Sequence, residues 1–207
     1  MMPSGSLMRV EPGAARLPST AGHALRDNPS LPMIGFLIVE MIIGYEWFIS
    51  GLVKFVRGDF PAGLGDELLK KSAEMAPWYA SFIKGVVIPN GIAFGYAIEI
   101  AELLAGIALI GGPLLWLLAW ERLPDRSRLL VLVATVVAAI GGAFLAVNLH
   151  MANAGSHPWL LPSDANDEGI DLDSVLPATQ VLIATVSIIL FRRLRRSSID
   201  MASQRRL

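Results

Sequence analysis

The sequence has 207 residues, of which 54% are hydrophobic and 17% are charged, and its formal net charge is -1. Because soluble domains carry about 25% charged residues, this composition indicates an integral membrane protein and excludes a basic nucleic-acid-binding domain. Cysteine is absent, which excludes disulfides, thiolate catalysis and cysteine-ligated iron-sulfur clusters, so any redox chemistry must use a bound cofactor or quinone.

Residues 1–30 are predicted to be a disordered tail, because proline and glycine recur there among small and polar residues. The first apolar run begins near Met33 and ends near Val56. It is longer than the apolar core of a signal peptide, so we expect it to be retained as a membrane span.

The rest of the chain predicts an all-α membrane protein with a bundle of four transmembrane helices in a domain of residues 31–192. The expected spans are residues 33–56, 92–120, 129–150 and 175–191. Residues 64–88 are predicted to form a short helical segment in the membrane interface between the first two spans, anchored by aromatic side chains. Residues 193–207 are expected to be a basic cytoplasmic tail.

Two stripes of small and charged residues recur at helical spacing. The first span carries Glu40, Gly44, Trp47, Gly51 and Lys54, and the second carries Gly95, Glu99, Glu102 and Gly106. The stripes match, and their glycines would allow another helix to approach closely.

Lysine and arginine are distributed unevenly along the chain. Twelve of the seventeen lie in the N-terminal tail, the 121–128 loop and the C-terminal tail, and the 151–174 loop has none. The positive-inside rule therefore predicts a multi-pass protein of the inner (plasma) membrane with both termini in the cytoplasm.

With this orientation and a rise of about 1.5 Å per residue, seven polar residues are predicted to converge on the outer half of the bundle. They are Glu46, Lys54, Glu99, Glu102, Asn148, His150 and Gln180. Glu40 is expected to stand nearly alone in the inner half. A charged side chain costs about 3 kcal/mol to insert into lipid. The cluster is therefore either a structural network, which Tyr96 could join, or a polar pocket open to the outer leaflet, with residues 64–88 as its lid.

The sequence EMIIGYEWFISGLVKF (40–55) resembles the first helix of DoxX/DoxD-type membrane proteins, with its Gly-x-x-Lys element at Gly51 to Lys54. PWYASFIKGVVIPN (77–90) and ELLAGIALIGG (102–112) are similar to the DoxD-like branch, and the resemblance covers residues 33–190. Family members usually carry an arginine near the start of the first helix, where this sequence has Glu40. The resemblance implies a four-helix bundle and a role in thiosulfate:quinone oxidoreduction, or in membrane oxidoreductase complexes of sulfur and oxidative-stress metabolism. Its motifs fall on Gly51, Lys54, Glu102 and Gly106.

The resulting hypothesis is a subunit of a redox complex that binds a quinone or another small molecule in the outer half. Glu99 and Glu102 would exchange protons with the quinone, and Lys54 would polarise a carbonyl or balance their charge. Aromatic side chains would pack against the quinone ring or close the entrance of the pocket; these are Trp47, Trp78, Tyr79, Phe82 and Tyr96. Polar side chains would contact the ligand; these are Glu46, Asn148, His150 and Gln180.

Partners and alternatives follow from the same features. No metal, haem or flavin site is evident in the sequence, so electrons would come from a substrate or a redox partner subunit, and the chain could also form a homo-oligomer. One alternative is a membrane scaffold that recruits soluble redox enzymes through its basic tail. Another is a small proton-coupled transporter that uses the same carboxylates.

Overall fold

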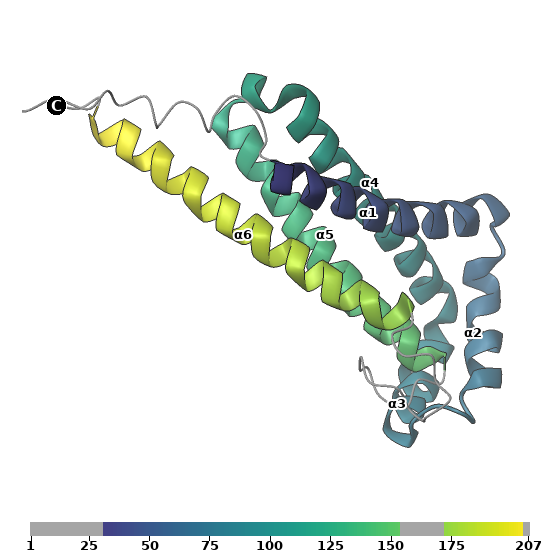
Figure 1. Ribbon diagram of the computed structural model, residues 1–207. Helices are drawn as coiled ribbons and strands as arrows, with labels where there is room; N and C mark the ends of the chain where they lie inside the picture. The colour runs from purple at the N-terminus through teal and green to yellow at the C-terminus, as the bar shows by residue number, and fades with distance from the viewer. Residues whose placement is uncertain (1–30, 154–171, 205–207) are drawn as a thin grey trace, which may run out of the picture.

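The computed structural model of the protein describes residues 31–153 and 172–204, within which every regular element is helical (Figure 1). The main helices are α1 (Leu31–Arg57), α2 (Phe60–Lys71), α3 (Pro77–Phe82), α4 (Gly91–Ala119), α5 (Asp125–Ala152) and α6 (Leu172–Gln204). A π-helical turn, η2 (Ile83–Val87), and a 3-10 turn, η3 (Ile88–Asn90), join α3 to α4, and a second 3-10 turn, η4 (Trp120–Arg122), follows α4. The predicted N-terminal tail and residues 154–171 of the acidic loop lie outside the described residues.

The prediction of an all-α membrane protein with four spans is confirmed. Four helical stretches are long and apolar enough to cross a bilayer: Leu31–Arg57, Pro77–Arg122, Asp125–Ala152 and Val175–Arg196. The second begins at Pro77 and not near Ile92, as the apolar run suggested, because α3, η2 and η3 continue helically into α4. Pro89 lacks the backbone N–H of a regular helix, which accounts for the irregular turns around it.

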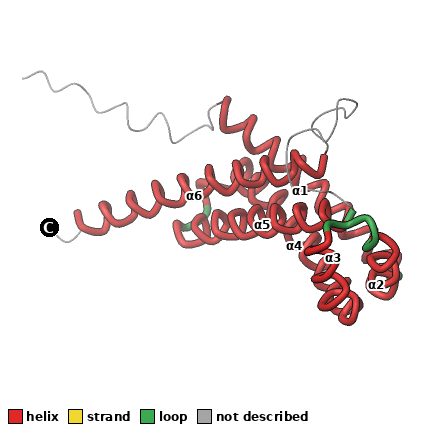
Figure 2. The backbone as a smooth tube through the Cα atoms, turned by 90° about the horizontal axis from the view of Figure 1, so that it is seen from below, coloured by secondary structure: helices red, strands yellow, loops and turns green. Residues whose placement is uncertain are grey.

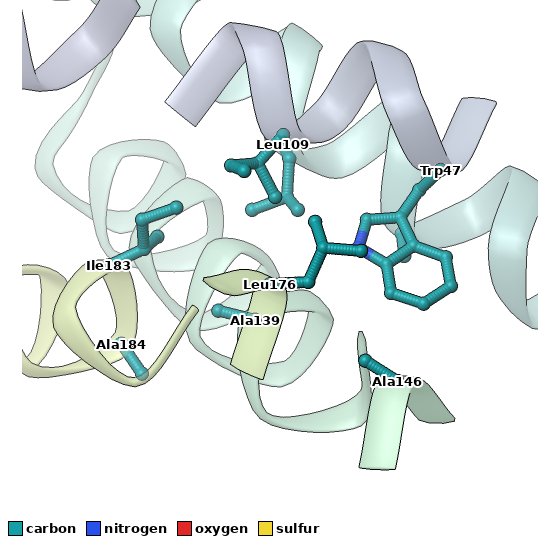
Figure 3. Packing of buried hydrophobic residues seen from close by; sticks show 9 residues of the cluster. Trp47, Leu109, Ala139, Ala146, Leu176, Ile183 and Ala184 are labelled. Atoms are coloured by element: carbon teal, nitrogen blue, oxygen red, sulfur yellow. The ribbon is translucent and has the colours of Figure 1, made fainter. Parts of the chain in front are cut away.

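The four long helices pack as two pairs. α1 lies against α4 and α6 lies against α5, and a contact between α4 and α5 joins the pairs (Figures 1 and 2). Where the pairs meet, a shared core contains Trp47 of α1, Leu109 of α4 and Ile183 of α6 (Figure 3). Ala139 and Ala146 of α5 belong to the same core, and their small side chains allow α6 to approach.

Glycines bring α1 and α4 together, as the two stripes indicated. A Cβ atom on Gly51 would lie 2.8 Å from the backbone nitrogen of Leu103, and one on Gly106 would lie 2.5 Å from the Cα of Phe48. Each glycine therefore leaves room for the backbone of the opposite helix. Gly95 is an exception within its stripe, because it faces Pro61 of α2 and not α1.

Gly58 ends α1 and turns the chain into α2. Its φ of 70° lies in the left-handed region, and its backbone N–H donates to the carbonyl oxygen of Lys54 at 3.0 Å. This is the usual way in which a glycine terminates a helix without steric cost.

Residues 60–90 form a packed unit, which we call the cap, at one end of the bundle (Figures 1 and 2). The cap has its own apolar core, in which Leu64, Leu68, Tyr79 and Ile83 pack with Met151 of α5. The prediction that residues 64–88 are helical is confirmed. Their apolar side chains pack on α4 and α5, and their position in the membrane interface stays a prediction.

Substitution of Gly106 by alanine tests the close contact between α1 and α4. We expect it to lower the free energy of unfolding by about 1–3 kcal/mol, because the new methyl group overlaps the backbone of Phe48. Gly111→Ala is the matched control on the same helix, since a Cβ there meets nothing within 4 Å, and alanine favours the helix. Thermal unfolding in detergent measures both variants, and equal midpoints would contradict the packing.

Candidate functional site

A buried ion pair joins α1 to α4 near the cap. The Lys54 Nζ atom donates to Glu102 Oε1 at 2.5 Å and Oε2 at 2.6 Å, and to Ser50 Oγ at 2.8 Å. The Glu102 side chain is fully buried, whereas 20% of the Lys54 side chain is exposed. Lys54 lies in the last turn of α1, where the helix dipole favours a cation. Phe60 of the cap covers it, with the ring centroid 5.1 Å from Nζ.

Glu99 lies three residues before Glu102 on the same face of α4 and is also buried. Its Oε2 atom has no hydrogen-bond partner among the described residues. Within that part of the chain, Lys54 is the one cation that forms an ion pair with either carboxyl group. We call the group formed by Lys54, Glu99 and Glu102 the carboxylate pair site. Because it has two carboxylates and one ammonium group, one bound proton would make its net charge zero.

Two further buried polar side chains lie close together near Gly142, one helical turn from Gly51 and deeper in the bundle. The Trp47 Nε1 and Gln180 Nε2 atoms both approach the point where a Cβ on Gly142 would be. Both side chains are buried, and neither Trp47 Nε1 nor the Gln180 amide atoms find a hydrogen-bond partner within residues 31–153 and 172–204. Because Nε2 and Oε1 of an amide are assigned from their surroundings, the reversed amide would direct Gln180 Oε1 toward the indole N–H.

A third polar group lies in the half of the bundle farther from the cap. Thr135 Oγ1 donates to Glu40 Oε1 at 3.3 Å, and Ser187 lines the same hollow, whose volume is about 10 Å³. All three residues are buried, and the hollow has room for about one water. The expectation that Glu40 stands nearly alone is therefore wrong, because hydroxyl groups of α5 and α6 face it.

Tyr79 and Asn148 tie the cap to the end of α5. The buried Tyr79 hydroxyl donates to the carbonyl oxygen of Asn148 at 3.0 Å. The Asn148 side chain donates to the Phe144 carbonyl of its own helix. His150 is half-buried near the end of α5. The structure thus places these three predicted residues at the junction of cap and bundle.

Four predicted site residues do not join the buried group, and this corrects their expected placement. Glu46, Trp78, Phe82 and Tyr96 are exposed on the protein surface. Glu46 is adjacent to Trp47, whose face of α1 meets the bundle, so the helical rotation of about 100° per residue turns Glu46 away. Tyr96 follows Gly95 and turns outward for the same reason.

Some contributors were not singled out from the sequence. Ser50 lies four residues before Lys54, a spacing that places both on one helix face. Thr135, Ser187 and Phe60 give no comparable signal, because each lies in an otherwise ordinary helical run. Their roles follow from packing between helices that are distant in sequence.

The carboxylate pair site is mostly buried, with Lys54 as its partly exposed member. Glu99, Glu102 and Lys54 line neither the small hollow at Glu40 nor a larger one of about 580 Å³ between α5 and α6. No family model, no curated protein and no solved structure matches this chain. The resemblance to DoxX and DoxD proteins therefore stays a prediction from the sequence motifs.

Replacing Lys54 with methionine tests the buried ion pair. The variant leaves the Glu102 carboxylate buried without its cation, which we expect to cost about 3–5 kcal/mol of stability. The double variant Lys54→Met/Glu102→Met should recover most of this loss, because two apolar side chains can replace a buried pair. Lys84→Met, at an exposed lysine of the cap, is the control. Unfolding midpoints that change additively in the double variant would contradict the pair.

Proposed function

We propose that this chain is the membrane subunit of a quinone-linked oxidoreductase system, as its resemblance to DoxX and DoxD proteins suggests. In this proposal Glu99 and Glu102 exchange protons with a quinone bound near the cap. The observation that supports it best is the buried Glu99 oxygen that has no partner among the described residues, three residues from a carboxylate that is held by Lys54.

The chemistry of quinone reduction explains why such a group would be needed. A quinone takes up two electrons and two protons to become a quinol, and an apolar bundle offers few groups that can supply protons. Buried carboxyl groups can do so when they lie within hydrogen-bond reach of the ring oxygen. Glu99 would transfer one proton and Glu102 the other, and Lys54 would hold Glu102 in place and balance the charge of the carboxylate that remains. The electrons would come from a substrate or a partner protein.

Entry of a quinone would require the cap to move. The carboxylate pair site lines neither hollow, and Phe60 lies over Lys54. The cap is held to α5 by the Tyr79 hydrogen bond and by the contact with Met151. Opening of this contact is a lid motion of the kind that admits substrates in many enzymes. Trp78 and Phe82, exposed on the cap, would then contact the ring or the membrane interface.

The proposal places the cap outside the cytoplasm. The arginines of residues 122–128 and 192–196 lie at the opposite end of the spans, and the positive-inside rule assigns that end to the cytoplasm. The electron donor would therefore reach the protein from the outer side of the plasma membrane.

Glutamine substitutions at Glu99 and Glu102 test the proposal. With thiosulfate supplied as the electron donor that the resemblance implies, we expect each to lower quinone reduction by the purified protein about 100-fold or more, the usual effect of losing a proton-transfer group. Glu46→Gln is the matched control, because Glu46 lies on α1 but is exposed. Bound quinone and unfolding midpoints are measured for each variant, so that a loss of folding is recognised.

Two outcomes would overturn the proposal. Unchanged quinone content and activity in both variants would assign the carboxyl groups to stability alone. Proton-driven uptake in vesicles without a redox partner would favour the proton-coupled transporter. The buried group of Glu40, Thr135 and Ser187 supports this second candidate, because it places a further carboxyl deeper in the bundle.

A further inference from the structure

An apolar groove runs between α5 and α6 at the end of the bundle opposite the cap. Its volume is about 580 Å³, within the range of small-molecule sites. Apolar side chains of both helices form its walls, among them Val133, Val137 and Phe191, and α1 and α4 do not contribute. The groove thus lies outside the carboxylate pair site, and Val133 and Val137 on its wall are exposed on the protein surface.

Three arginines stand at one end of this groove. Arg192, Arg195 and Arg196 line it together, and their spacing places them on one face of α6. All three are exposed, and none forms an ion pair with an acidic residue within the described part of the chain. The apolar run of α6 ends at Phe191, immediately before these arginines. In a membrane-spanning α6, this change from apolar to basic residues is expected at the level of the lipid headgroups.

We propose that this groove binds one anionic glycerophospholipid, with an acyl chain along the walls and the phosphate against the arginines. Guanidinium groups form paired hydrogen bonds with phosphate oxygens, and basic pockets between membrane helices are suited to anionic headgroups. A neutral quinone would leave the three guanidinium groups without an anionic partner. Free phosphate would leave the apolar walls of the groove uncovered. The combination of apolar walls with arginines that form no ion pair among the described residues fits a charged lipid best.

Native mass spectrometry of the detergent-purified full chain tests this site. The protein is titrated with phosphatidylglycerol or with phosphatidylcholine of the same acyl chains. We expect phosphatidylglycerol to be retained at least 10-fold more strongly, and Arg195→Gln to reduce this preference several-fold. Arg193→Gln is the matched control, because it removes the same charge from an adjacent exposed residue that does not line the groove.

Two further experiments distinguish a bound lipid from other occupants of the groove. Val133→Phe should fill the groove and reduce retention of phosphatidylglycerol, whereas Ile140→Phe, at an exposed residue outside the groove, should not. Inorganic phosphate at the same concentration should not displace the lipid. Equal retention of the two lipids, equal effects of the two arginine variants, displacement by phosphate, or a dimer that occupies the groove in place of lipid would each overturn the proposal.

Discussion

The ion pair between Lys54 and Glu102 is the interaction on which the relative position of α1 and α4 depends. Burying either charge alone in an apolar bundle would cost several kcal/mol, so the two helices must keep the alignment in which the charges meet. Gly51 lies against the backbone next to Glu102, and this close approach brings the Lys54 ammonium within 2.6 Å of both carboxylate oxygens. Glycine packing and charge pairing therefore specify the same helix contact.

The end of α1 couples this pair to the cap. Lys54 supplies the carbonyl that accepts the N–H of Gly58 where α1 ends, and Phe60, two residues later, lies over its ammonium group. The cap then packs on α4 and is tied to α5 through Tyr79. A movement of the cap would thus change the surroundings of Lys54 directly. This connection makes the buried carboxylate pair site compatible with a ligand that enters from the cap.

The sequence allowed the four spans and the contact face of α1 to be predicted, because apolar length and the spacing of glycines and charges are local properties. It also pointed to Glu99, Glu102, Trp47 and Gln180, which are all buried. The predicted depth along the membrane did not distinguish the exposed Glu46 and Tyr96 from these buried residues. Depth does not indicate which face of a helix contacts the neighbouring helices. The Thr135 bond to Glu40 joins residues 95 positions apart, and only the packing of α5 could reveal it.

We propose that the buried carboxyl groups near the cap contact a quinone. Labelling with a hydrophobic carbodiimide, which modifies buried carboxylic acids, tests it directly when the modified residues are identified by peptide mass spectrometry. We expect Glu99 to be modified and a soluble quinone analogue to slow this reaction, while labelling at Glu40 is unchanged. Modification of Glu99 at the same rate with and without the analogue, or no modification at all, would show that no quinone binds at these carboxyl groups.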